Sequence, residues 1–352
     1  MPPAAAGPGA FDAARRYTPA RALRIGALLF LLLALVAAAS VMTGSSGVGL
    51  RDLPAILAGS VSEEAHAILV EVRLPRVLLA AAVGAALAAA GAALQSVLRN
   101  PLADPYVLGL SGGAGLGAIL WTSAAAGAGA VASALRPISA FAGSVLAVLG
   151  LLGLARLRGR RSPETMLLMG AVINATFVAL ILFVVTVADI GRYQGVMYWL
   201  VGSLSPPTWT ALAVIYLCVA AGAAALTFLG GHLNLMSVGE ETAEHLGSPV
   251  GRVRLVSILA ACLITAAAVS VSGLVGFVGL MVPHVARIWF GPDNRLLIPA
   301  SALLGGAMLT AADTVARTAL APTQIPVGVI TALLGGPFFL WLFSRREEGG
   351  EP

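Results

Sequence analysis

The sequence predicts an all-α protein that crosses a membrane many times. Its 352 residues are 59% hydrophobic and only 11% charged, and the mean hydropathy is +0.94. A soluble domain cannot bury that much apolar surface, whereas lipid-facing helices must expose it. The chain also contains 41 glycines, and small residues let helices approach closely inside a bilayer. We therefore expect a polytopic helical membrane protein.

Apolar segments of about the length that spans a bilayer recur ten times. They are Ile25–Met42, Val77–Leu98, Val107–Ala126, Ile138–Ala155, Thr165–Ala188, Trp209–Leu229, Leu255–Val271, Val275–Phe290, Leu296–Ala312 and Val327–Phe343. The eighth segment contains Gly276, Gly279 and Pro283, which predict a broken or kinked helix.

The arginines indicate which side of the membrane each connection occupies. With both termini in the cytoplasm, 15 of the 21 arginines fall in inner segments and six in outer ones. This bias satisfies the positive-inside rule, and an odd number of spans would break it. We therefore expect residues 1–21 to form a disordered cytoplasmic tail, 22–346 the transmembrane domain and 347–352 a short cytoplasmic tail.

Several classes of function are excluded by what the sequence lacks. All 21 basic residues are arginine, so there is no lysine for an ATP-binding P-loop or a Schiff base. Any ATP hydrolysis must therefore occur on another chain. The four histidines and two cysteines are scattered, which predicts no metal site, and no cofactor or nucleic-acid motif is visible. An ion-coupled transporter or an intramembrane enzyme would need ionisable or catalytic groups at membrane depth, and few are present.

The segment Leu233–Arg254 is the longest polar interruption in the second half of the chain. It is long enough for two short helices that break at Gly239. Glu240 and Glu241 would then lie in a first helical turn, where the amide dipoles favour carboxylates, and Ala243 and Leu246 would give a small apolar face. Such a loop suits either a surface that another protein binds or a solvated connector.

Three arginines on the predicted outer side run against the positive-inside bias. Arg73 and Arg76 flank Pro75 at the entrance of the second span, and Arg317 lies four residues after Asp313 in the ninth. They could dock a partner protein. Alternatively, Arg73 and Arg76 extend to the membrane interface and Arg317 forms an ion pair with Asp313.

The turn after the second span also has a predicted contact. Two prolines stiffen the segment from Arg99 to Pro105, and Asp104 is placed to pair with Arg99. The glycines that follow from Gly109 favour close helix packing over phosphate binding, because no strand precedes them.

Eight motifs occur in order and carry a resemblance to a known family. They are RLPR (73–76), RNPLADPYVLG (99–109), SGGAGLGA (111–118), YWLVGSL (198–204), LNLMSVGEETAEHLG (233–247), GFVGLMVPHVAR (276–287), ADTVAR (312–317) and IPVGVITALLGGPFFLWLF (325–343). Together they make residues 51–343 resemble the permease subunit of binding-protein-dependent ABC importers for iron chelates, heme and cobalamin.

The resemblance implies a cobalamin-importer-type fold with ten helices and cytoplasmic termini in a bacterial cytoplasmic membrane. It implies a homodimer with two ATP-binding-cassette subunits inside and a periplasmic or lipid-anchored substrate-binding protein outside. A ferric siderophore is the first choice of substrate, and heme and cobalamin are the alternatives.

The resemblance also implies roles for particular residues. The residues expected to dock the binding protein are Arg73, Arg76 and Arg317. The residues expected to contact the ATPase and couple it to transport are Leu235, Met236, Gly239, Glu240, Glu241, Ala243, Leu246 and Gly247. The translocation path is expected along the fifth and tenth spans, at Gly170, Ala171, Asn174, Thr331, Gly335 and Gly336.

Overall fold

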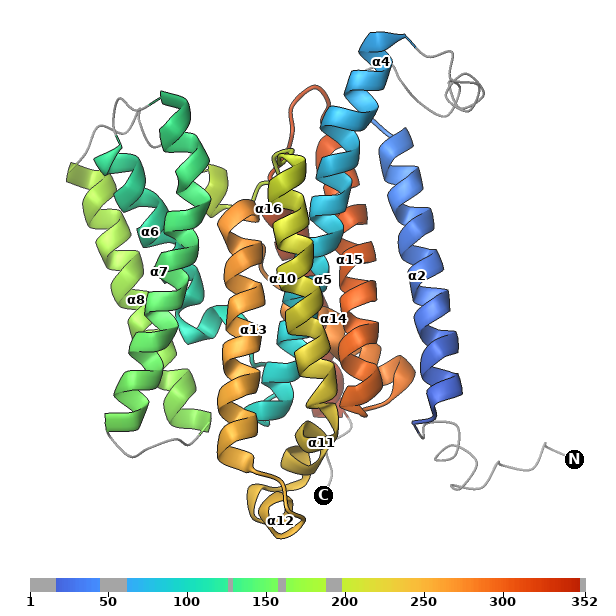
Figure 1. Cartoon of the computed structure of the whole chain (residues 1–352), viewed down its shortest axis with the longest axis vertical. Coiled ribbons are helices and arrows are strands. Elements are labelled where there is room, and N and C mark those ends of the chain that lie inside the picture. The colour runs from blue at the N-terminus through green and yellow to red at the C-terminus, as the bar shows by residue number, and fades with distance from the viewer. Residues whose placement is uncertain (1–16, 45–61, 126–128, 158–162, 188–197, 349–352) are drawn as a thin grey trace, which may run out of the picture.

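The computed structural model describes residues 17–44, 62–125, 129–157, 163–187 and 198–348, and the secondary structure in these ranges is helical (Figure 1). The longer helices are α2 (Pro19–Met42), α5 (Leu74–Val97), α6 (Leu110–Ala124), α7 (Gly129–Leu157), α8 (Pro163–Val187), α10 (Trp209–Phe228), α13 (Val250–Ser272), α14 (Val278–Phe290), α15 (Asn294–Thr318) and α16 (Val327–Glu348). The shorter ones are α4 (Glu63–Ala67), η2 (Ile68–Arg73), η3 (Pro105–Leu108), α11 (Gly230–Val238) and α12 (Glu240–His245).

Each of the ten predicted spans contains a helix in the described part of the chain. Seven helices there are long and apolar enough to cross a membrane, whereas α14 and the apolar part of α16 are shorter. The chain is therefore a multi-pass membrane protein. Helix α2 begins at Pro19, inside the predicted tail, because Thr18 caps its first turn by accepting a hydrogen bond from the Arg21 amide.

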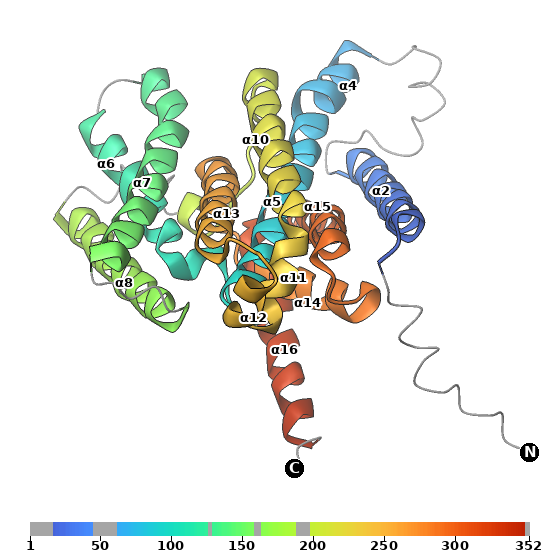
Figure 2. The ribbon, with the colours of Figure 1, turned by 60° about the horizontal axis from the view of Figure 1, so that its bottom comes forward.

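Helix α5 is the centre of the bundle, and nearly every residue from Pro75 to Val97 is buried. Helices α10, α13, α14 and α15 surround it, α2 lies at one side, and α6, α7 and α8 form a group at the other (Figures 1 and 2). The N-terminal end of α2, the C-terminal end of α16 and α12 all lie at one end of the bundle, here termed the α12 end (Figure 1). The opposite end, which carries α4, is termed the α4 end.

The second span begins earlier than the sequence suggested. Helices α4, η2 and α5 follow one another without a break, so that Pro75 lies inside a continuous helix and not at its start. Proline has no N–H to donate, and the backbone just before it is a π-helical turn in which the Leu74 amide donates to the Leu69 carbonyl.

The helix break predicted in the eighth span lies before α14, because α14 runs without interruption from Val278 to Phe290 and contains both Gly279 and Pro283. Helix α13 ends at Gly273, which has a positive φ of 67°, and Phe277 also has a positive φ of 68°. The left-handed backbone at Gly273 brings its Cα against the Trp199 carbonyl, where a side chain has no room. The break sets α14 close to α5.

Paired glycines allow the central helices to touch along their backbones. A Cβ placed on Gly84 of α5 would overlap the Gly305 carbonyl of α15, and a Cβ on Gly91 would overlap the Gly279 carbonyl of α14. Small residues therefore fix the distance between α5 and its neighbours.

We predict that Gly84→Ala lowers the stability of the purified protein by about 1–3 kcal/mol, because one methyl group overpacks this contact. The matched control is Gly26→Ala in α2, where a Cβ meets no atom within 4 Å. Thermal melting in detergent should show a lower Tm for the first variant alone. Equal Tm values would mean that α5 and α15 are not held at this distance.

Candidate functional site

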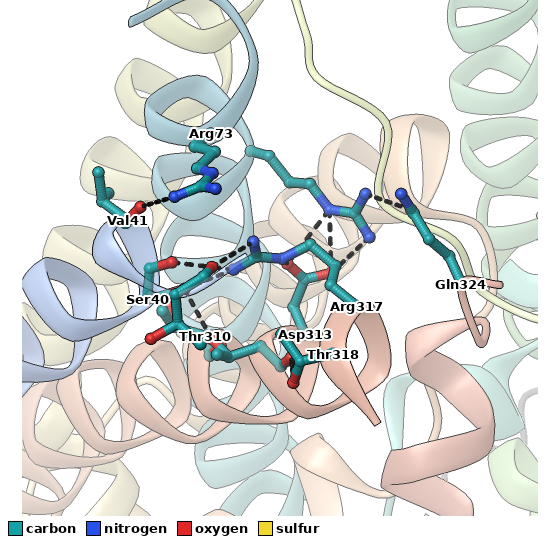
Figure 3. Close-up of polar contacts among 11 residues, drawn as sticks. Ser40, Val41, Arg73, Thr310, Asp313, Arg317, Thr318 and Gln324 are labelled. Atoms are coloured by element: carbon teal, nitrogen blue, oxygen red, sulfur yellow. Dashed lines mark hydrogen bonds and ion pairs between the residues drawn. The ribbon is translucent and has the colours of Figure 1, made fainter. Parts of the chain in front are cut away.

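A cluster of charged residues occupies the α4 end of the bundle (Figure 3). Arg73 comes from η2, Arg76 from α5, and Asp313 and Arg317 from α15. The four-residue spacing of Asp313 and Arg317 places both on one side of α15. The cluster therefore joins the continuous helix of η2 and α5 to the end of α15, which is far away in the sequence.

Asp313 lies at the centre of this cluster and is fully buried. The Arg76 guanidinium donates to Asp313 Oδ1 from Nε at 3.1 Å and from Nη2 at 2.9 Å. Arg317 Nε donates to Asp313 Oδ2 at 2.9 Å. The remaining Arg76 nitrogen, Nη1, donates to Gln324 Oε1 at 2.7 Å. One carboxylate thus holds two guanidinium groups.

The same arginines anchor the end of α2. Arg317 Nη2 donates to Ser40 Oγ at 2.8 Å, and its Nη1 donates to the Thr43 carbonyl at 3.2 Å. Arg73 Nη1 donates to the Val41 carbonyl at 2.9 Å (Figure 3). The Val41 and Thr43 carbonyls at the end of α2 thus accept hydrogen bonds from guanidinium groups in place of the helical N–H partners that the last turn lacks.

The cluster has more positive than negative charge and borders a cavity. Three guanidinium groups and one carboxylate leave a net charge of +2 among these four side chains. The cavity has a volume of about 200 Å³ and is lined by Arg73, Arg76 and Arg317 together with Gly44, Ile68, Val72 and Gln324. Arg73, Arg76 and Arg317 are themselves buried, at 5%, 8% and 8% exposure, so the positive charge lies inside the cavity, where carboxylates of a partner would complement it.

Two hypotheses were open for these arginines, docking of a partner protein or local pairing within the chain. The ion pair between Asp313 and Arg317 is present, as the alternative account predicted. Arg76 shares that carboxylate, which the sequence did not indicate. Docking by Arg73, Arg76 and Arg317 remains a prediction.

The segment predicted to couple to an ATPase forms α11 and α12, and α12 lies at the tip of the α12 end (Figure 1). The break at Gly239 and the positions of Glu240 and Glu241 in a first helical turn are confirmed. Leu246 is 64% exposed and Ala243 is buried. Gly247 has a φ of +81°, a conformation that glycine adopts without strain, and it turns the chain toward α13.

The apolar surface of this segment differs from the expected one. Met236 is buried in the core, and Leu235 is partly buried. Neither side chain is free to insert into a partner, because α11 packs that side against the bundle. Val238 at the end of α11 is 77% exposed and, with Leu246, offers apolar surface to a partner.

Helix α11 is fixed to the start of α15 by asparagine side chains. Asn234 Oδ1 accepts from the Asn294 amide at 2.8 Å, and Asn234 Nδ2 donates to Asp293 Oδ1 at 2.8 Å. Ser96 Oγ of α5 then donates to Asn294 Oδ1 at 2.8 Å. This network holds α11 against the central helices.

The predicted pair of Asp104 and Arg99 is wrong. Asp104 is buried and caps η3 by accepting from the Tyr106 amide at 2.8 Å. Arg99 instead lies with its Nη2 3.6 Å from Glu240 Oε1, and Arg254 pairs with the same carboxylate oxygen. The turn after α5 therefore contacts α12.

The predicted path residues divide into two groups. Thr331 is fully buried and donates to the Gly328 carbonyl, Gly335 packs on Phe277, and Gly170 packs on η3. These three are enclosed by their own chain in this conformation and cannot line a path. In contrast, Ala171 is exposed, and a Cβ on Gly336 would meet no atom within 4 Å.

Asn174 has a structural role that the sequence did not suggest. Its Oδ1 accepts from Ser111 Oγ at 2.9 Å and from the Gly112 amide at 3.0 Å, so it caps the first turn of α6 from α8.

Four residues that form the sites described above were not predicted from the sequence. Ser40, Gln324 and Asn234 are single polar residues in apolar or loop segments, and Val238 is one valine among many. Their roles depend on which chain segments meet, and no local signal marks them.

The described helices form a multi-pass bundle with a basic cavity at one end and a helical segment at the other, an arrangement that suits a membrane permease. The model of the FecCD transport family matches residues 31–345. The chain belongs to this family, the permeases of ABC importers for metal chelates.

Individual relatives agree with this assignment. The chain is 41% identical to the cobalamin import permease BtuC of Halobacterium salinarum over 82% of this chain and 76% of the relative. It is 38% identical to the hemin permease HmuU of Yersinia pestis over 93% and 96%, and 33% identical to the iron(3+)-hydroxamate permease FhuB of Bacillus subtilis over 91% and 82%. A solved inward-facing conformation of a metal-chelate type ABC transporter matches with a TM-score of 0.77 and 29% identity, over 92% of this chain and 99% of that one.

We predict that Asp313→Asn destabilises the protein by about 3–5 kcal/mol, because it leaves two buried guanidinium groups without a counter-charge. The control is Glu71→Gln, which removes a carboxylate from an exposed position at the same end. Denaturation of the purified permease should distinguish the two variants. A parent-like stability for Asp313→Asn would show that the arginines do not need this carboxylate.

Proposed function

We propose that the chain is the permease subunit of an importer that carries a ferric siderophore, works as a homodimer, and takes its energy from two ATPase subunits. The observation that supports this best is the position of two unlike surfaces at opposite ends of one bundle. A basic cavity at the α4 end suits a substrate-binding protein, and an exposed helical segment at the α12 end suits an ATPase.

The outer arginines serve docking through their excess charge. Asp313 neutralises only one of three guanidinium groups, so acidic side chains of a binding protein would complete the pairing. Arg73 lines this cavity at the end of η2, and its Nη1 donates to the Val41 carbonyl. Two copies of the cavity in a dimer would face two lobes of one binding protein.

Coupling at the α12 end rests on exposed apolar side chains next to carboxylates. Val238 and Leu246 are the apolar contacts, and Glu241 and Glu244 are exposed beside them. Glu240 faces its own chain through Arg99 and Arg254 and so fixes α12 in place. We assign partner contacts to the former four residues.

The path is proposed along the exposed faces of α8 and α16. These faces present small and apolar residues such as Ala171, Val172, Leu333 and Gly336. A lining with few charges binds a bulky chelate weakly, which permits release. Asn174 would border this path while it caps α6.

The alternative substrates have a specific observation in their favour. The cobalamin and hemin relatives are more similar in sequence than the iron-hydroxamate relative. Titration of the cognate binding protein with ferric hydroxamate, hemin and cobalamin decides among the three. Membership of an ABC permease family leaves no support for an ion-coupled mechanism.

For docking, we expect Arg73→Glu to weaken binding of the substrate-binding protein at low ionic strength and to flatten its salt dependence. Carboxylates of the binding protein would pair with the Arg73 guanidinium, and two copies of the cavity act together and steer the encounter. Arg136→Glu, the same charge change outside the cavity, should leave binding intact. If Arg136→Glu weakens binding of the substrate-binding protein and Arg73→Glu does not, docking occurs elsewhere on the outer surface.

For coupling, we expect Leu246→Asp to abolish transport while the complex keeps basal ATPase activity. A carboxylate in an apolar contact is costly to desolvate, so α12 would no longer follow the ATPase. Leu246→Met should behave like the parent. Normal coupled transport by Leu246→Asp would rule out this segment as the contact.

A further inference from the structure

A cavity between α7, α8 and α13 lies apart from the two sites described above. Its volume is about 500 Å³, and pockets of roughly 300–1,000 Å³ are the usual size for small-molecule ligands. Leu149 and Leu152 of α7, Met166 of α8, and Leu255 and Leu259 of α13 form its wall. Leu149 and Leu255 are still about half exposed, at 52% and 47%, so the cavity opens on the membrane-facing side of these helices.

One charged residue lies at the end of this apolar wall. Among the lining residues that the structure describes, Arg254 is the charged one, and it belongs to the start of α13 at the α12 end. This is the predicted cytoplasmic surface, where anionic lipids attract basic side chains.

Arg254 is also part of the small charge cluster that holds α12. Glu240 pairs with Arg254, and Arg99 lies 3.6 Å from the same carboxylate oxygen. Two guanidinium groups and one carboxylate leave a net charge of +1 in this cluster. A second anion beside Arg254 would neutralise it.

We propose that this cavity binds one anionic phospholipid, with an acyl chain between α7 and α13 and its phosphate beside Arg254. A soluble anion would not need the leucine wall, and a neutral apolar molecule would not need the arginine. An anionic phospholipid matches both the leucine wall and the arginine, because its acyl chain is apolar and its phosphate is negatively charged. Because Arg254 also pairs with Glu240, this arginine would link the lipid to α12, which is proposed to couple to the ATPase.

Two glycines in the lining make the apolar part testable by itself. A Cβ on Gly153 of α7 or on Gly251 of α13 would meet no atom within 4 Å. Gly153→Leu therefore fills the cavity and leaves Arg254 and Glu240 untouched. Gly150 on the same helix is equally open but does not line the cavity, so Gly150→Leu is the control for Gly153→Leu.

The charged part is tested by Arg254→Gln. Its control is Arg252→Gln, because Arg252 is exposed on α13 and lies outside the lining of the cavity.

The test is native mass spectrometry of the full-length permease released from nanodiscs that contain equal amounts of phosphatidylglycerol and phosphatidylcholine with matched acyl chains. We expect the parent and both controls to retain one phosphatidylglycerol in preference to phosphatidylcholine. Arg254→Gln should reduce this preference roughly fivefold, as expected for one arginine near an anionic headgroup. Gly153→Leu should reduce retention of phosphatidylglycerol while its Tm stays close to that of Gly150→Leu.

Three results would overturn the proposal. The parent could retain both lipids equally, or all variants could retain phosphatidylglycerol alike. Gly153→Leu could also split a dimer into monomers, which would mean that a second copy of the chain fills the cavity. The measurement uses neither ATP nor a chelate, so its outcome is independent of the transport function.

Discussion

The buried carboxylate of Asp313 is the interaction on which the outer half of this protein depends. Guanidinium groups inside a helical bundle are costly unless they are paired and hydrogen-bonded, and Asp313 pairs with both Arg76 and Arg317. Through these arginines it connects α15 to α5 and to the end of α2. Its single negative charge also leaves the cluster positive, so the feature that stabilises the fold creates the surface proposed to bind a partner.

Helix α15 links that surface to the opposite end of the molecule. Asp313 and Arg317 lie in its last turns, and Asn294 at its first residue bonds to Asn234 of α11. Between them, Gly305 brings α15 into backbone contact with Gly84 of α5. The proposed docking surface and the proposed coupling segment are therefore joined by one continuous helix in the most closely packed part of the bundle.

Much of this architecture could be predicted from the sequence because it follows from local patterns. Hydrophobic runs located the helices, and Gly239 located the break between α11 and α12. The fate of individual polar residues was harder to predict, since it depends on which distant segments meet. Arg99 pairs with Glu240 because the turn after α5 reaches α12, and Asp104 caps its own turn. The burial of Thr331 and Met236 could not be predicted either, because an amphipathic pattern does not say which neighbour covers a side chain.

We propose that the chain conducts a metal chelate only as part of an ATP-driven complex. The most direct measurement is uptake of radiolabelled ferric hydroxamate, hemin or cobalamin into proteoliposomes that contain the permease and its ATPase subunits, with the binding protein outside and ATP inside. We expect uptake of one chelate, and this uptake should stop when the ATPase subunits, ATP or the binding protein is omitted. Uptake by the permease alone, driven by an ion gradient, would contradict it.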